Sequence, residues 1–155
     1  MMQQREQMMT QMKEMADKNE AAGKAFLAEN GAKPGVQTLE GGVQYEVMVE
    51  GKGPKPKLNS QVKINYHGTF PDGKVFDSTT EARPGKTPGP VELNSGIFVN
   101  GFKTALHAMP EGSKWKIVIP GDQAYGIRGR APVIGPNQTI VFELELLEVS
   151  EPAGE

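Results

Sequence analysis

The amino-acid sequence predicts an α+β protein in which a curved antiparallel β-sheet, a half-barrel, wraps around one short helix and follows a long N-terminal helix. Three observations lead to this prediction. The first thirty residues contain no proline and one glycine, whereas the rest of the chain is rich in both. Several later segments alternate apolar and polar residues with a period of two, as half-buried strands do. One short segment near residue 100 has helical spacing instead.

The N-terminal helix is expected over residues 1–30, which are rich in Met, Gln, Glu, Lys and Ala. Asn30-Gly31 is a C-cap signal, and the following Pro34-Gly35 cannot continue a helix. A thin heptad-like seam runs through Met1, Arg5, Met8, Met12, Met15, Asn19, Ala22 and Phe26. A helix this polar buries little by itself, so it must pack on its own domain, pair with another chain, or fray. The alternative is a solvated spacer whose methionines are incidental.

The segments after Pro34 are short and are bounded by glycine and proline. Strands are expected, by their alternation, over residues 43–49, 62–66, 115–119 and 140–146. Asp72-Gly73 is a tight-turn dipeptide between strand-like runs. Residues 100–108 place apolar side chains at helical spacing before Met109-Pro110 and predict the short helix. The proline-rich segment 78–90 suits neither a helix nor a central strand and is expected to form a long surface loop.

These patterns divide the chain into three parts. Residues 1–33 are expected to form a helical arm, part of a linker or dimerisation helix. Residues 34–150 are expected to form one domain, and residues 151–155 a disordered tail. A chain of 155 residues is long enough for one domain with its own hydrophobic core.

Composition excludes several classes of function. Seventeen basic and nineteen acidic residues give a net charge of -2, too balanced to argue for a nucleic-acid partner or an anionic membrane surface. The absence of cysteine excludes disulfides and thiolate chemistry, and two histidines are too few for an ordinary metal site. The longest apolar runs are far below membrane-spanning length, so no membrane span is expected. Residues 1–15 are too polar for a signal peptide, although a removed upstream signal would leave no trace.

Three segments carry a resemblance to a known family. They are Val62-Lys-Ile-Asn-Tyr-His-Gly-Thr-Phe-Pro-Asp-Gly-Lys-Val-Phe-Asp-Ser78, Val99-Asn-Gly-Phe102 with Ala105-Leu-His-Ala-Met-Pro-Glu-Gly112, and Pro120-Gly-Asp-Gln-Ala-Tyr-Gly126 with Ile134-Gly-Pro-Asn-Gln-Thr-Ile-Val-Phe-Glu-Leu-Glu-Leu-Leu147. In this order they resemble the FKBP family of peptidyl-prolyl cis/trans isomerases and cover residues 54–149. Any one segment alone would be a weak signal; the three together are specific.

The resemblance implies an FKBP-like fold and an enzyme that rotates X-Pro bonds in an apolar pocket and assists protein folding, with no cofactor and no metal. The expected catalytic residues are Tyr66, Asp77, Tyr125 and Phe142, and the expected substrate-binding residues are Phe76, Val91, Phe98, Val99, Phe102 and Ile134. The implied partners are unfolded or proline-containing polypeptides, and family members also bind the macrolides tacrolimus and rapamycin.

Each of these residues also has a simpler structural explanation. Phe76, Val99 and Phe142 lie on apolar faces and could be ordinary core residues. Asp77 could equally be a turn residue that caps Ser78 and Thr79. The pocket floor, usually tryptophan in the family, is Phe102 here, which should deepen the pocket and loosen its grip on proline. Trp115 is expected in the core.

The residues from Asn19 to Asn30, followed by Gly41-Gly-Val-Gln-Tyr45, are similar to the bacterial macrophage-infectivity-potentiator, or Mip-like, branch of the family. In that branch a long helix links the catalytic domain to an upstream dimerisation region. The dimer is not carried over to this chain by the resemblance, and a homodimer through the N-terminal helix stays open. The branch occurs in the periplasm or cell envelope and in the cytoplasm, so the compartment stays open. Two other functions stay open as well: a chaperone module that binds proline peptides with little turnover, and an interaction protein that binds through its Met-rich helix.

Overall fold

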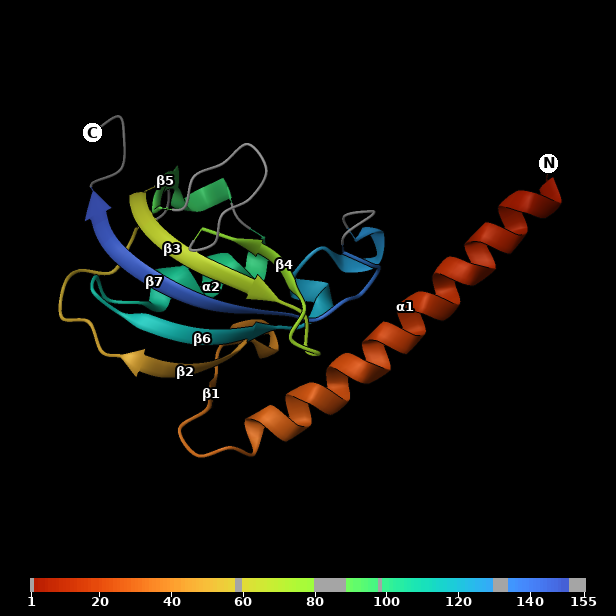
Figure 1. The fold of residues 1–155 in the computed structure, drawn as a ribbon, viewed down its shortest axis with the longest axis horizontal. Helices are drawn as coiled ribbons and strands as arrows, with labels where there is room; N and C mark the ends of the chain where they lie inside the picture. Colours follow the sequence, from red (N-terminus) through yellow and green to blue (C-terminus); the bar gives the residue numbers. More distant parts are fainter. Residues whose placement is uncertain (1, 58–59, 80–88, 98, 130–133, 151–155) are drawn as a thin grey trace.

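A computed structural model describes residues 2–57, 60–79, 89–97, 99–129 and 134–150 of the chain. Its helices and strands are α1 (Met2–Gly31), β1 (Gln37–Thr38), β2 (Gln44–Val49), β3 (Gln61–Thr69), β4 (Val75–Ser78), β5 (Val91–Asn94), α2 (Asn100–Ala108), β6 (Lys114–Ile119) and β7 (Ile140–Ser150) (Figure 1). Four 3-10 turns join them: η1 (Glu40–Gly42), η2 (Ser95–Ile97), η3 (Gly121–Gln123) and η4 (Gly126–Arg128).

The strands form one antiparallel sheet in the order β1-β2-β6-β7-β3-β4, and β5 pairs with β3 beside β4. The sheet is open rather than closed, and it curves around α2 (Figure 1). The predicted fold class, a half-barrel around one short helix behind a long helix, is therefore confirmed. The short strands β1 and β5 were not predicted, because two and four residues are too few to show a period.

The core lies between the concave face of the sheet and α2. Alternate residues of each long strand face α2, as the period of two requires. The fully or nearly fully buried members of this core include Val62, Ile64, Trp115, Ile117, Ile119, Ile140, Phe142, Leu144 and Leu146 from the sheet, and Phe102, Ala105 and Leu106 from α2. Trp115 is 5% exposed, so its expected place in the core is confirmed.

Gly101 sets how closely α2 approaches the sheet. A Cβ atom at this position would collide with the Ile119 side chain and would lie 3.1 Å from the carbonyl oxygen of Gln123. Only glycine therefore lets the first turn of α2 rest against β6, and this close packing buries the next residue, Phe102, to 3% exposure.

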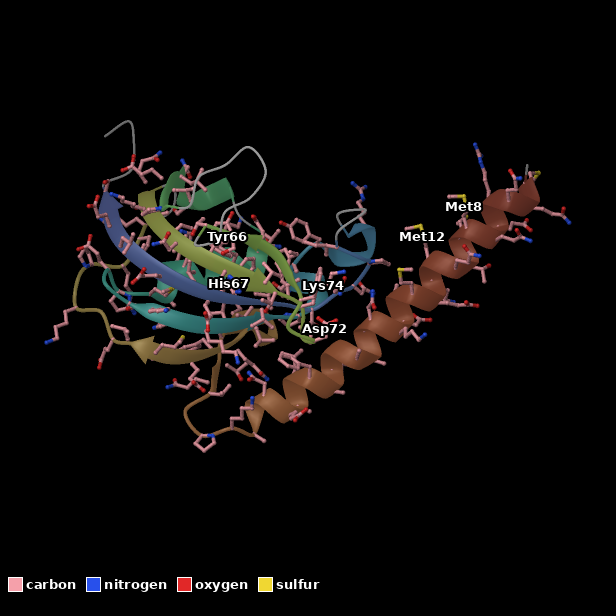
Figure 2. The ribbon with its side chains drawn as sticks, in the orientation of Figure 1. Met8, Met12, Tyr66, His67, Asp72 and Lys74 are labelled. Atoms are coloured by element: carbon pink, nitrogen blue, oxygen red, sulfur yellow. The ribbon has the colours of Figure 1, made fainter. Side chains whose placement is uncertain are left out.

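A tight turn joins β3 to β4, as Asp72-Gly73 predicted. Gly73 has a φ of 93°, a conformation that glycine adopts without strain, and its N–H donates to the Phe70 carbonyl at 2.8 Å. The Lys74 N–H donates to Asp72 Oδ1 at 2.9 Å, and both side chains lie at the end of this hairpin (Figure 2).

The segment 78–90 differs from the predicted surface loop at its start. Ser78 belongs to β4, and Ser78 and Thr79 are buried at 1% and 2% exposure. Thr79 is buried because its side chain and its main chain both hydrogen-bond to the backbone of β3, which no local sequence pattern reveals. Residues 80–88 lie outside the described residues.

The helix predicted over residues 1–30 is α1. Its packed face is built on Ala16, Gly23 and Asn30, which are buried and spaced seven residues apart. This packed face coincides only in part with the predicted heptad-like seam. Three residues of that seam, Met8, Met12 and Met15, are 63%, 48% and 52% exposed. Small residues at 16 and 23 let the second half of the helix lie against its own domain, whereas the first half extends past it (Figure 1).

Within the described residues, no helix is both long enough and apolar enough to cross a membrane.

Candidate active site

Four aromatic side chains from four different elements converge beside α2. Phe142 of β7 is at the centre: its ring centroid lies 5.8 Å from Tyr66 of β3, 5.5 Å from Phe76 of β4 and 5.0 Å from Phe102 of α2. All three pairs are edge-to-face, the arrangement in which a positive ring edge meets a negative ring face. We call these four residues the aromatic cluster.

The cluster is open at one side. Phe102 and Phe142 are buried at 3% and 6% exposure, whereas Tyr66 and Phe76 are half-buried and pack against the core from outside. A second aromatic contact extends the apolar surface, because Phe70 stacks on Phe76 with centroids 5.0 Å apart. The cluster therefore combines a buried apolar base with rings that still reach solvent.

Gly68 on β3 makes the aromatic cluster possible. It pairs with Phe142 across the β3–β7 ladder and with Asp77 across the β3–β4 ladder. A Cβ atom at Gly68 would lie 2.7 Å from Phe76 Cζ and 2.8 Å from Phe142 Cε1, closer than carbon atoms can approach. The two rings occupy the space that a side chain at position 68 would need. Sequence analysis did not single out Gly68, although an isolated glycine inside a strand pattern is a known sign of such a close approach.

Asp77 lies against Tyr66, as predicted. The Tyr66 hydroxyl donates a hydrogen bond to Asp77 Oδ2 at 2.8 Å, and Asp77 Oδ1 accepts the Ser78 N–H at 2.9 Å. Asp77 therefore has both roles that were considered for it: one carboxylate oxygen binds Tyr66, and the other caps Ser78. A carboxylate fixed in this way also fixes the Tyr66 phenol, whose ring forms part of the cluster.

Thr79 holds the backbone of Tyr66 and was missed by sequence analysis. Its Oγ1 accepts the Tyr66 N–H at 2.8 Å and donates to Asn65 Oδ1 at 3.0 Å, while its own N–H donates to the Tyr66 carbonyl at 2.8 Å. Buried polar groups of this kind cost stability unless they are paired, and two of these three bonds hold the backbone of Tyr66. The signal was hidden because Thr79 stands in a segment with the composition of a loop.

The remaining predicted residues that the structure describes come from other segments of the chain. Val91, Val99 and Tyr125 are half-buried against the core, and Ile134 is buried at 3% exposure. Val99 is the N-cap of α2, where its extended backbone directs its carbonyl to the Lys103 N–H at 3.0 Å. Phe98, predicted to bind substrate, lies outside the described residues.

A separate groove of about 850 Å³ lies between η1 and α2. It is lined by Glu40, Gly41, Asn100, Lys103, Thr104, His107, Ala108 and Gln123 and shares no residue with the aromatic cluster. In it, His107 Nε2 hydrogen-bonds to Ser95 Oγ at 3.1 Å. Burial lowers the pKa of His107 below its ordinary 6.5, and the charge of Lys103 lowers it further. Most of the residues that line the groove are polar or charged, unlike those of the aromatic cluster, so the two places suit different ligands.

Chemically, the cluster offers an apolar surface, one phenol and one carboxylate. The four members of the aromatic cluster include no serine, threonine, cysteine or lysine, the usual nucleophiles of acyl transfer. Its side chains suit the gripping and desolvation of an apolar ring, with polar groups at the margin to position a carbonyl.

Comparison with known proteins places the site in a family context. A family profile described as FKBP-type peptidyl-prolyl cis-trans isomerase matches residues 53–147, and a second, described as the domain amino terminal to FKBP-type peptidyl-prolyl isomerase, matches residues 1–47. The outer membrane protein MIP of Legionella longbeachae is 41% identical over 138 residues, 89% of this chain and 57% of that protein. The FKBP-type 22 kDa peptidyl-prolyl cis-trans isomerase of Escherichia coli is 43% identical over 129 residues, 83% of this chain and 60% of that protein.

Solved structures give the same picture. Crystalline FkpA from Escherichia coli superposes with a TM-score of 0.84 at 38% identity and covers 94% of this chain and 65% of its own. The peptidyl-prolyl cis-trans isomerase of Pseudomonas syringae pv. tomato superposes with a TM-score of 0.79 at 38% identity and covers 88% of this chain and 96% of its own. The chain spans 57% to 60% of the two curated relatives above.

Proposed function

The chain belongs to the FKBP-type peptidyl-prolyl cis-trans isomerase family, and we propose that it catalyses rotation about X-Pro bonds in protein substrates and so assists their folding. The observation that carries this proposal is the aromatic cluster, in which side chains from β3, β4, β7 and α2 meet at one half-open apolar site. The names of two of the similar proteins support the same activity, because those from Escherichia coli and Pseudomonas syringae are both called peptidyl-prolyl cis-trans isomerases.

The reaction requires a change of environment rather than a covalent step. Amide resonance gives rotation a barrier of about 18 to 20 kcal/mol by placing positive character on nitrogen and negative character on oxygen. An uncatalysed X-Pro bond takes about 10 to 100 s to rotate, so catalysis in milliseconds requires a factor of about 10⁴, or roughly 5 to 6 kcal/mol. A water-poor aromatic site disfavours the planar, charge-separated amide relative to the twisted transition state.

Each residue of the site has a role in this proposal. Phe102 forms the base under the proline ring, and Phe76, Val91, Val99 and Ile134 form the surrounding walls. Phe142 is the central ring that holds the other aromatic side chains in place. The Asp77 carboxylate fixes the Tyr66 phenol, and the Tyr125 hydroxyl donates to a substrate carbonyl so that the twisted amide is held in position.

An X-Pro peptide assay, protease-coupled or by exchange NMR, tests the proposal. We expect the chain to accelerate isomerisation, Phe142→Ala to abolish most of the acceleration, and Tyr125→Phe to reduce it moderately. Val75→Ala is the matched control, because Val75 on β4 is 40% exposed and stands outside the cluster. Unchanged rates in both site variants would show that the aromatic cluster is not the active site.

The second candidate function is a module that binds proline peptides with little turnover. The observation that favours it is Phe102, because a base smaller than the family's usual tryptophan holds proline less firmly. Peptide binding without acceleration would select this function. Inhibition of the reaction by a macrolide such as rapamycin would instead place activity and ligand at one site.

We further propose that the chain forms a homodimer through the first half of α1. Met8, Met12 and Met15 leave a stripe of exposed thioether side chains, of which Met8 and Met12 lie where α1 extends past the domain (Figure 2). Residues 1–47 match the domain that precedes family catalytic domains, which supports a role for this helix in assembly. Sedimentation equilibrium should show a dimer that Met8→Lys with Met12→Lys dissociates and that the control Gln7→Lys with Gln11→Lys preserves. A monomer at all concentrations would refute the proposal.

A further inference from the structure

The packed half of α1 lies against the part of the chain that carries two of the site residues. Residues 120–129 include Tyr125, and residues 134–139 begin with Ile134. Along α1, Glu20, Lys24 and Leu27 line one side of a cavity of about 210 Å³ whose other side is lined by Pro120, Gly121, Asp122, Asn137 and Thr139. The N-terminal helix and the outer loops of the domain therefore share one interface.

The contacts across this interface are specific. Asn19 Nδ2 donates to the Pro136 carbonyl at 2.9 Å, a hydrogen bond between groups 117 residues apart in the chain. Gly23 lies so close to Thr139 that a Cβ atom at position 23 would collide with the Thr139 hydroxyl. Gly135 faces the helix as well, since a Cβ there would lie 3.1 Å from Asn19 Nδ2. An amide and two glycines thus fix the helix against residues 135–139.

A second contact sets the direction of α1. Gln44 on β2 accepts from Asn30 Nδ2 and donates to the Leu27 carbonyl, both at 2.8 Å. The helix is thereby held to the sheet at its end and to residues 135–139 about two turns earlier. Two separated attachment points prevent the helix from pivoting about either one. We call residues 19–30 of α1, held at these two points, the brace.

The brace is linked to Tyr125 through one further hydrogen bond. Asn137, next to the Pro136 that Asn19 holds, donates its N–H to the Gly126 carbonyl at 2.7 Å. Asn137 has a φ of 53°, a left-handed conformation that asparagine tolerates better than most residues. Gly121 packs so tightly on the backbone of Asn137 that a Cβ at 121 would strike its carbonyl group. A movement of residues 135–137 would therefore displace Gly126 and its neighbour Tyr125.

We propose that Asn19 and Gly23 are positioning residues for the isomerase site. They hold residues 135–139 and, through the Asn137–Gly126 hydrogen bond, keep Tyr125 and Ile134 in the geometry that the substrate requires. This inference rests on the proposed function. It makes the N-terminal helix a part of the site's support rather than only a spacer or an assembly element.

The test uses the full chain and X-Pro peptide kinetics. Asn19→Ala should lower kcat/KM by about 3- to 10-fold, the factor that one ordinary hydrogen bond contributes to an equilibrium. Asn19→Asp, which has the same shape but no N–H donor, should lower it at least as much. Gly23→Leu should also lower it, because the helix must move away from Thr139. The controls Lys18→Ala and Ala22→Leu, at exposed neighbouring positions of α1, should leave kcat/KM unchanged.

A double-mutant cycle separates positioning from general destabilisation. In a Tyr125→Phe background the hydroxyl to be positioned is gone and only Ile134 still depends on Asn19, so Asn19→Ala should cost less there than in the unsubstituted chain, because coupled sites are not additive. Equal losses in both backgrounds would overturn the proposal and indicate a stability effect only. Unchanged kinetics in every Asn19 and Gly23 variant of an active chain would overturn it as well.

Amide hydrogen exchange distinguishes failure of the brace from failure of the proposed function. The Asn137 N–H should exchange faster in Asn19→Ala than in Lys18→Ala, whether or not the chain is active. Equal exchange would overturn the brace. An inactive unsubstituted chain with faster Asn137 exchange in Asn19→Ala would support the mechanical link, overturn its role in isomerisation and refute the proposed function.

Discussion

The most direct test of the aromatic cluster is Gly68→Ala, which adds one methyl group where two rings meet. The backbone of Gly68 lies in strand β3 and needs no left-handed conformation, so alanine can adopt it without backbone strain. The new Cβ would lie 2.7 Å from Phe76 Cζ and 2.8 Å from Phe142 Cε1, so the rings must retreat by roughly 0.7 to 0.8 Å to reach ordinary contact distance.

The two rings do not yield equally. Phe142 is 6% exposed and is packed against three other rings, whereas Phe76 is half-buried and can move outward. Insertion of a methylene into a packed core costs about 1 to 3 kcal/mol. The loss of chain flexibility on replacing glycine by alanine returns about 0.4 to 1 kcal/mol. We therefore expect the free energy of unfolding to fall by about 1 to 2 kcal/mol and the folded site to lose the position of Phe76.

Urea unfolding followed by the fluorescence of Trp115, the single tryptophan, measures the first effect. Peptide kinetics measures the second, and kcat/KM should fall by about tenfold or more, because small misplacements of positioning groups are costly. The double variant Gly68→Ala with Phe76→Leu removes one of the two rings that the new Cβ would meet, so it should recover part of the stability without recovering activity. If Gly68→Ala matched the unsubstituted chain in stability and in kcat/KM, the close-packed cluster described above would be wrong.

Three further predictions concern the hydrogen bonds near the site and the groove on α2. Tyr66→Phe removes the donor to Asp77 Oδ2 and should lower kcat/KM severalfold while costing about 1 to 2 kcal/mol in urea unfolding, because the bond to a charged group is only partly buried. Thr79→Val keeps the shape of the side chain but leaves the Tyr66 N–H unpaired, which should cost about 1 to 3 kcal/mol by the same measurement. The pKa of His107 is lower in the folded chain than in the unfolded chain, so the unfolded chain binds more protons below pH 6.5. The free energy of unfolding should therefore fall as the pH drops from 6.5 to the lowered pKa. Below that pKa, His107 should cause no further change.

Controls make these three results interpretable. Asp72→Ala removes an exposed carboxylate from the β3–β4 turn without touching Tyr66, and its activity should match that of the unsubstituted chain. Thr69→Val changes a threonine of β3, the strand that carries Tyr66, at a position outside the hydrogen bonds of Thr79. His107→Gln should flatten the fall in stability below pH 6.5, and a curve identical to that of the unsubstituted chain would show that another group produces it.

Much of the fold follows from local patterns in the sequence. The helix predicted over residues 100–108 is α2 with the same bounds. The alternating runs at 62–66, 115–119 and 140–146 lie in β3, β6 and β7, and the run at 43–49 exceeds β2 by one residue. These elements were predictable because each has enough residues to show its period and because glycine and proline mark its ends.

The site was predictable to a different extent. Resemblance to a family directed attention to Tyr66, Phe76, Phe102 and Phe142, which lie together in the structure. The apolar pattern alone would have assigned two of them, Phe76 and Phe142, to an ordinary core. Gly68 and Thr79 were not singled out because their roles depend on contacts with residues of other strands. The heptad-like seam of α1 was a poor guide for a related reason: the face that packs is selected by the small residues Ala16 and Gly23, not by the methionines.

By itself the sequence determined the type and order of the long elements, since apolar period, capping and turn chemistry act over a few neighbouring residues. Only the tertiary structure decided which of those residues meet. The contact of Gly68 with Phe76 and Phe142, the hold of Thr79 on Tyr66 and the bond from Asn19 to Pro136 depend on strand register and helix approach. Those distances are set by packing of the whole chain, and no local stretch of sequence contains them.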